Sequence, residues 1–200
     1  MGLPFSAQIE SVRAGSLLLA STDLRGDTFQ RTVVYILEHD ERGTFGLVVN
    51  RPTKISVASV APAWEDFAAE PCVVHNGGPV RKDGLLCLGL PREGVAAAES
   101  GSTESLGFSV VAPDIAVVDL EGDAQLIASS LQYVRIFAGY SGWASGQLAA
   151  ELSRGAWYVV SGLPQDVFVG AGVDLWGQVI RRHGARAGVL ATHPIDTGVN

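Results

Sequence analysis

The chain has 200 residues, of which 47% are hydrophobic and 18% are charged, and its formal net charge at pH 7 is −7. This length and composition fit one globular domain, residues 1–200, that buries roughly 70% of its unfolded surface. No apolar run approaches the ~18 residues of a membrane-spanning helix, and the first residues lack the pattern of a signal peptide. We therefore expect no membrane contact.

Acidic residues are concentrated in one part of the chain. Seven acids and no Lys or Arg lie between Glu93 and Val134. The one cationic cluster, Arg181, Arg182 and Arg186, falls at the end of a predicted helix, where cations stabilise the helix dipole. A surface that binds duplex DNA needs several clustered cations, so we expect no direct DNA binding.

Cysteine and histidine spacing predicts neither a metal nor a cofactor. Cys72 and Cys87 do not form a CxxC pair, and two isolated thiols are typical of a reducing cytoplasm. The four histidines lack H-x-H or HExxH spacing. The glycine runs match neither a P-loop nor the dinucleotide-binding fingerprint.

Hydrophobic periodicity predicts more strands than helices, without strict alternation between them, which favours a mixed sheet over a doubly wound one. Residues 92–107, which are small, acidic and rich in Ser and Gly, are predicted to form a mobile loop. In chain order we expect strands at 15–20, 33–37, 45–49, 72–75, 84–90, 108–111, 115–118, 134–138, 157–160 and 167–169. We expect helices at 56–60, from Pro62, from Asp123 to Leu131, from Ser145 to Gly155 and from Asp174 to Gly184.

The segment from Phe29 to Pro52 predicts the central β-hairpin. Two β-branched and aromatic runs are joined by the turn residues 40–43. Residues 33–37 are all apolar, so we expect this strand to be covered on both faces. Gly46, in the return strand, indicates a bulge or a close backbone approach.

Polar residues at one end of this hairpin form a candidate ligand-binding rim. Arg31 and Thr32 precede the first strand, and Asn50 and Arg51 follow the second, so antiparallel pairing places them together. The glycine turn at Asn76, Gly77 and Gly78 is a further candidate. Arginine forks and glycine N–H groups suit a carboxylate or phosphate. In the alternative interpretation, the two arginines are structural and pair with acids or with loop carbonyls.

A serine and the histidines offer an enzymatic alternative. Ser141 lies between a predicted strand and a predicted helix, as in a nucleophile elbow, although Trp143 stands where the second glycine of G-x-S-x-G belongs. His39 and His75 are candidates for acid–base chemistry, but each also fits a structural role. These features leave a hydrolase as the second hypothesis.

Several stretches together resemble the YqgE/AlgH family of bacterial proteins. The similarity includes the segments GLVVNRP at 46–52 and GGPV at 77–80. In the second half it includes Gly139-Tyr140, Gly142-Trp143, Gly146-Gln147-Leu148 and Glu151. These segments run in order across most of the chain. This chain departs from the family pattern at Ser141, because the pattern does not specify serine at that position.

The resemblance implies an α+β fold in which a mixed, strongly twisted β-sheet rolls into a partial barrel flanked by about four helices. It implies a bacterial cytoplasmic protein with no known catalytic residue, metal or cofactor. The first hypothesis is a non-enzymatic regulatory module whose rim binds a small anion or a protein partner. Because family members are often called transcriptional regulators, a regulator that acts without direct DNA contact is a third hypothesis.

Overall fold

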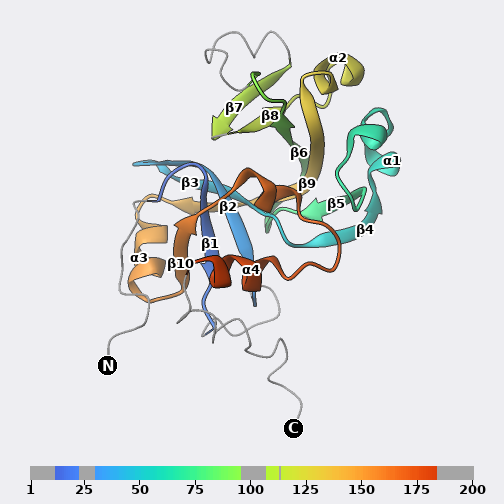
Figure 1. The fold of residues 1–200 in the computed structure, drawn as a ribbon. Coiled ribbons are helices and arrows are strands. Elements are labelled where there is room, and N and C mark those ends of the chain that lie inside the picture. The colour runs from blue at the N-terminus through green and yellow to red at the C-terminus, as the bar shows by residue number, and fades with distance from the viewer. Residues whose placement is uncertain (1–11, 23–29, 96–106, 113, 184–200) are drawn as a thin grey trace.

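The computed structural model describes residues 12–22, 30–95, 107–112 and 114–183. Figure 1 shows a mixed α+β architecture in which a strongly curled sheet forms a half-barrel with helices around it. Within the described residues, no helix is long and apolar enough to cross a lipid bilayer. Most of the predicted 92–107 loop, residues 96–106, lies outside the described part of the chain.

The sheet has ten strands, eight of which follow the order β10-β1-β2-β3-β9-β6-β8-β7, while β5 joins β4 to β9. All pairings are antiparallel except that of β5 with β9. The strands are β1 (Ser16–Ala20), β2 (Val33–Asp40), β3 (Gly43–Val48), β4 (Pro52–Ser56), β5 (Val73–Asn76), β6 (Val80–Pro91), β7 (Phe108–Ala112), β8 (Ile115–Val118), β9 (Leu131–Ala144) and β10 (Trp157–Ser161).

In the described part of the chain, four α-helices and two 3-10 helices flank the sheet: α1 (Val57–Val60), α2 (Ala124–Ala128), α3 (Gln147–Ser153), α4 (Leu175–Arg182), η1 (Pro62–Phe67) and η3 (Pro164–Phe168). Two of the predicted helix starts are confirmed by their caps. The Asp123 carboxylate accepts from the N–H groups of Gln125 and Leu126, and that of Asp174 accepts from Gly177. The parallel pairing of β5 with β9 in an otherwise antiparallel sheet, together with these helices, confirms the predicted mixed sheet with flanking helices.

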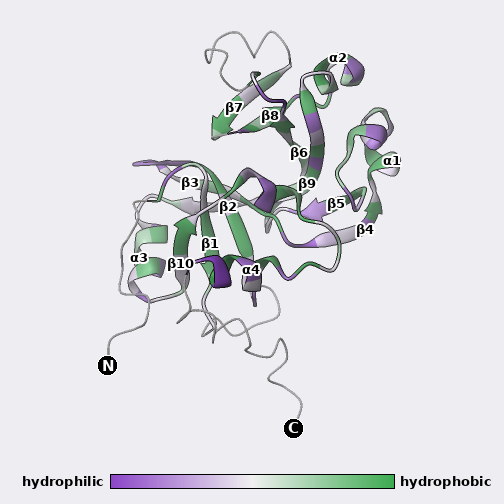
Figure 2. Cartoon of the chain, viewed as in Figure 1, coloured by the Kyte–Doolittle hydropathy of each residue, from purple (hydrophilic) through white to green (hydrophobic). Residues whose placement is uncertain are grey.

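The predicted central hairpin is confirmed, and both faces of β2 are covered. Val33 and Tyr35 point into a core that includes Trp176 of α4. Val34 and Ile36 point into a second core that includes Leu148 of α3. Figure 2 shows the resulting concentration of apolar residues in β1, β2 and β10. A third core lies on the other half of the sheet, beneath η1 and α2.

Three sequence predictions of local structure are wrong. The segment 167–169 is not a strand, because Pro164 starts the 3-10 helix η3 and the Asp166 carboxylate accepts from the Leu163 N–H at 2.8 Å. The helix from Asp123 ends at Ala128, and Leu131 already belongs to β9. Ser145 does not cap α3, whose N-cap is Gly146.

Gly46 provides a test of the central hairpin. A Cβ at this position would lie 2.6 Å from the Tyr35 carbonyl oxygen, so β2 and β3 approach too closely for any side chain. We expect Gly46→Ala to lower the free energy of unfolding by about 1–3 kcal/mol through overpacking. Urea denaturation measures this loss. The matched control is Gly170→Ala, where a Cβ meets no atom within 4 Å; equal stability of the two variants would contradict the packing.

Candidate functional site

The structure brings the predicted rim residues together at one end of the hairpin. The Asn50 side chain accepts from the Val33 N–H at 3.0 Å and donates to the Arg31 carbonyl at 2.7 Å. Arg51 Nη2 donates to the Gln30 carbonyl, and it lies 3.4 Å from Thr32 Oγ1. The Asn76 N–H donates to the Arg51 carbonyl at 2.8 Å, so the glycine segment also reaches this end of the hairpin.

Many of the rim's polar groups are engaged by the chain itself. The Arg31 guanidinium forms an ion pair with Asp174 and lies 4.6 Å from the centre of the Trp176 ring. The Gly77 N–H donates to the Ala138 carbonyl at 2.9 Å, and the Gly78 N–H donates to the Asn76 side chain at 3.2 Å. These contacts favour the structural interpretation of Arg31 and of the glycine N–H groups, while anion binding at the rim stays a prediction.

Ser141 does not stand in a nucleophile elbow. Strand β9 continues to Ala144, and Ser141 is paired with Gly46 inside the sheet. Ser141 is 5% exposed, and its hydroxyl donates to the Gly77 carbonyl at 3.3 Å. The elbow prediction is therefore wrong, because Gly139 bends the strand without ending it.

The described histidines occupy structural positions. His39 Nδ1 lies 2.7 Å from Thr44 Oγ1 at the end of β2. His75 is 2% exposed, and its Nδ1 donates to the Val73 carbonyl at 3.2 Å. His183 follows α4, and His193 lies outside the described residues. Across the described ranges, no group of three or more His, Cys, Asp or Glu side chains is arranged to hold a metal.

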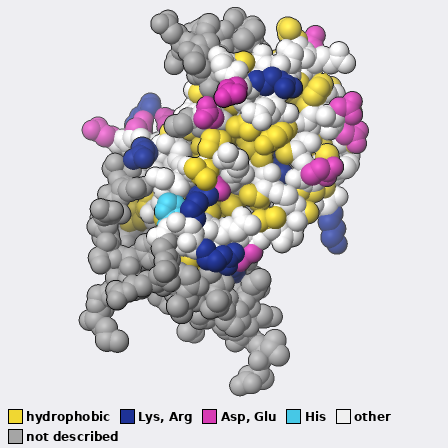
Figure 3. Space-filling view, viewed as in Figure 1, with side chains coloured by type: hydrophobic (Ala, Val, Ile, Leu, Met, Phe, Trp, Pro, Cys, Tyr) yellow, Lys and Arg dark blue, Asp and Glu magenta, His cyan; other side chains and the backbone are white. Residues whose placement is uncertain are grey.

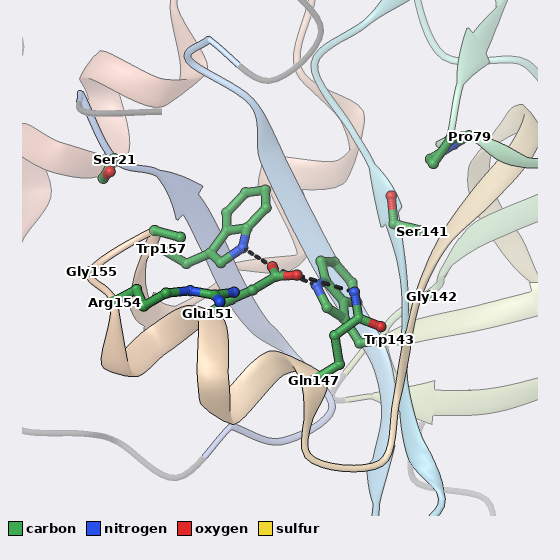
Figure 4. A pocket seen from close by; sticks show the side chains of 11 residues that line it. Ser21, Pro79, Ser141, Gly142, Trp143, Gln147, Glu151, Arg154, Gly155 and Trp157 are labelled. Atoms are coloured by element: carbon green, nitrogen blue, oxygen red, sulfur yellow. Dashed lines mark hydrogen bonds between the residues drawn. The ribbon is translucent and has the colours of Figure 1, made fainter. Parts of the chain in front are cut away.

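A cavity of about 510 Å³ lies where the end of β9, helix α3 and the start of β10 meet. We call it the Glu151 cavity. Figure 4 shows Trp143, Gln147, Glu151 and Trp157 gathered on one side, with Ser141 and Pro79 across from them. Arg154, at the end of α3, also lines it. Sequence reasoning missed this cavity.

The Glu151 carboxylate is the polar centre of the cavity. Its Oε2 accepts hydrogen bonds from two indoles, Trp143 Nε1 at 2.9 Å and Trp157 Nε1 at 2.7 Å. Its Oε1 accepts from Gln147 Nε2 at 3.1 Å. The two indole rings are nearly perpendicular, at 85°, with centroids 5.9 Å apart. One carboxylate thus joins α3 to both β9 and β10.

These contacts keep the carboxylate charged. Burial raises the pKa of Glu151, but the hydrogen bonds from Trp157, Trp143 and Gln147, with the positive charge of Arg154, outweigh burial and lower the pKa below its ordinary value. At neutral pH the cavity therefore contains a carboxylate anion. One signal of this arrangement is present in the sequence, since Gln147 and Glu151 are four residues apart on one helix face.

Comparison with known proteins identifies the family. Residues 17–188 match the profile of a family described as AlgH-like. The chain belongs to the AlgH-like family. A UPF0301 protein of Mycobacterium tuberculosis strain H37Rv is 48% identical over 191 residues, which cover 96% of this chain and 92% of that protein. A UPF0301 protein of Mycobacterium marinum is 49% identical over 191 residues, which again cover 96% of this chain and 92% of that protein.

Two solved structures share the fold. A crystal structure of a Corynebacterium diphtheriae protein has a TM-score of 0.83 and 31% identity, covering 90% of this chain and 92% of that one. The solution structure of the AlgH protein from Pseudomonas aeruginosa has a TM-score of 0.65 and 27% identity, and the match covers 90% of this chain and 94% of that one. The expected resemblance is confirmed, and the half-barrel is an AlgH-like fold.

The family segment at 139–151 supplies the polar centre of the cavity. Trp143, Gln147 and Glu151, which carry part of the sequence resemblance, are joined by hydrogen bonds. The segment in which the sequence offered a candidate nucleophile therefore lines a cavity around a carboxylate.

Buried His75 predicts a pH dependence of stability. Burial and the nearby charge of Arg135 lower the pKa of His75 to about 4, against 6.5 for an ordinary histidine, despite the hydrogen bond to Val73. As pH falls below 6.5, the unfolded chain binds a proton that the folded chain does not, so stability declines until about pH 4. Relative to His75→Gln, we expect the parent to lose about 2–3 kcal/mol between pH 7 and 4.5.

Urea denaturation of both proteins across this pH range measures the difference. A constant difference in unfolding free energy between parent and variant would contradict a neutral, buried His75.

Proposed function

We propose that this AlgH-like protein is a non-enzymatic regulatory module that binds a small molecule in the Glu151 cavity. The observation that carries the proposal is the charged Glu151 carboxylate, fixed by three side-chain donors in the wall of the cavity. The cavity's volume of about 510 Å³ lies within the range of small-molecule sites. A fixed polar group in a largely apolar wall is how such sites orient their ligands.

The absence of a nucleophile arrangement supports binding over hydrolysis. Among the described residues, the Ser141 hydroxyl donates its hydrogen bond to a backbone carbonyl, and the side chains of His39 and His75 are hydrogen-bonded to other groups. We also propose that the protein works in a reducing cytoplasm, supported by two free cysteines, Cys72 and Cys87.

We propose that any influence on transcription is indirect. On the face seen in Figure 3, basic side chains are interspersed with acidic ones, and hydrophobic side chains gather near the centre. A continuous basic stripe would favour duplex binding, and this face offers none. A bound ligand or protein partner is therefore the proposed route of regulation.

The rim at Arg51 is a second candidate, for a small anion. Among the contacts of the described residues, only Nη2 of this half-buried guanidinium takes part in hydrogen bonds. The exposed Asn76 stands next to it in the sheet. A phosphate or carboxylate at the remaining nitrogens would form charge-assisted hydrogen bonds.

Indole NMR signals test the Glu151 cavity directly. The chain has four tryptophans: Trp143 and Trp157 donate to Glu151, whereas Trp64 and Trp176 donate to backbone carbonyls elsewhere. We expect members of a fragment set that covers cations, anions and neutral compounds to shift the first two signals and leave the other two unchanged. Single Trp→Phe variants assign the signals.

A blocking variant completes this test. Pro79 is exposed and lines the cavity, so Pro79→Phe is expected to weaken binding of those fragments about tenfold without unfolding the protein. Leu163→Phe, at an exposed position outside the cavity, is the matched control. The proposal fails when no fragment shifts the Trp143 and Trp157 signals, or when all four signals shift together.

Arg51→Ala tests the rim. Loss of its hydrogen bonds to the Gln30 carbonyl and Thr32 is expected to lower the unfolding free energy by about 1–3 kcal/mol in phosphate-free buffer. Lys54→Ala, on the exposed neighbouring strand, is the control and is expected to change stability little. A phosphate-induced rise in the parent's Tm that Arg51→Ala abolishes would support an anion site; no rise in the parent would leave the rim a structural feature.

A further inference from the structure

We propose that the ligand of the Glu151 cavity carries a primary ammonium group, which Glu151 binds, and a short apolar body, which lies against the cavity wall. This inference rests on the proposed function, since it names the chemical class of molecule that the cavity takes. Three features of the site support it: an open acceptor position, an anion without a contacting cation among the described residues, and an apolar wall.

The first feature is the open acceptor position on Glu151. A carboxylate accepts about four hydrogen bonds, two at each oxygen. Oε2 accepts both indole N–H groups, whereas Oε1 accepts only from Gln147. The side chain is partly exposed and lines the cavity. One further donor can therefore reach Oε1 from within the cavity.

The second feature is the charge. The three donors to Glu151 are neutral, and among the described residues no Lys or Arg nitrogen lies within 4.0 Å of its carboxylate. Arg154, which attracts it from a greater distance, is an exposed residue at the end of α3. A donor that is itself cationic would form a stronger hydrogen bond here than a neutral one.

The third feature is the wall. Beside the carboxylate, the cavity is lined by Pro79, Ala156 and the two indoles, which suit a small aliphatic group. Ser21 also lines the cavity; this residue is 3% exposed, and its buried hydroxyl has no hydrogen-bond partner among the described residues.

Glu151 also has a structural role, because it joins α3 to the two indoles. That role uses three hydrogen bonds and would be served by a neutral acceptor. The test must therefore measure a preference for charge, which a purely structural carboxylate would not produce.

Three probes of nearly equal shape measure this preference: isopentylamine, isopentanol and isovalerate. Each is titrated into the full chain at neutral pH while the indole signals of Trp143 and Trp157 are followed, with those of Trp64 and Trp176 as internal controls. We expect isopentylamine to bind about tenfold more tightly than isopentanol, and isovalerate to bind more weakly than either.

Two variants assign the preference to the carboxylate. Glu151→Gln keeps the shape of the side chain and removes its charge, so it is expected to bring isopentylamine affinity down to about that of isopentanol. Arg154→Glu alters an exposed residue, so the fold is expected to persist. It adds a negative charge at the cavity, and isopentylamine affinity is expected to rise about threefold while isopentanol affinity is unchanged.

The outcomes separate this inference from the proposed function. Equal affinities for the amine and the alcohol, or tightest binding of isovalerate, would overturn the ammonium assignment while leaving the cavity a binding site. Absence of shifts with all three probes also overturns the assignment; the fragment set then decides whether the cavity binds anything. Unchanged amine affinity in Arg154→Glu would overturn it even where Glu151→Gln does not fold.

Discussion

The whole sheet depends on one strand, β9, changing its partners part-way along its length. Residues 131–140 pair with β6, and residues 141–144 pair with β3. Gly139 stands at the change of partner with φ of +70°, and a Cβ there would lie 2.8 Å from the carbonyl oxygens of Gly78 and Val80. Glycine adopts this conformation at little cost, so β9 continues through the register shift that its pairing with β6 shows between Ala138 and Tyr140. The half-barrel follows from that continuity, since β9 carries both halves of the sheet.

Two long polar side chains fix the elements that pack onto this curved sheet, and they do so in different ways. Arg135, 1% exposed in β9, donates to the carbonyls of Val167, Val169 and Glu70, which joins two separate connections to the strand. Burial lowers its pKa to about 10, so it stays protonated at neutral pH. Glu151 makes the corresponding link for α3, but from the edge of a cavity. Arg135 is fully buried and, although its Nε has no hydrogen-bond partner among the described residues, it borders no open space, whereas Glu151 lines a cavity and keeps an acceptor position there, which is why ligand chemistry is assigned to Glu151.

Hydrophobic periodicity and local capping predicted the elements that they control, whereas features that depend on tertiary contacts had little signal in the sequence. The hairpin of β2 and β3 follows from apolar residues on both faces, and the caps at Asp123 and Asp174 follow from local hydrogen bonding. The elbow at Ser141 was wrong because a glycine in the left-handed region suits both a turn and a bent strand, and only the partner strands decide between them. The Glu151 cavity was not predicted because Trp157 lies in β10 and Glu151 in α3. The spacing of these two residues in the sequence does not indicate that their side chains meet. The rim was found because antiparallel pairing alone brings its residues together.

The two candidate sites lie at opposite ends of β3. Thr44, near its start, is paired with Trp143 in the cavity wall, whereas Asn50 and Arg51 follow its last residue. Six residues of strand span about 20 Å, beyond the ~10 Å within which substitutions usually interact. A change at the rim should therefore leave the cavity's ligand preference intact unless β3 itself shifts. Gly46, packed against the Tyr35 carbonyl between the two candidate sites, restricts such a shift, so the packing favours independence of the two candidate sites over coupling between them.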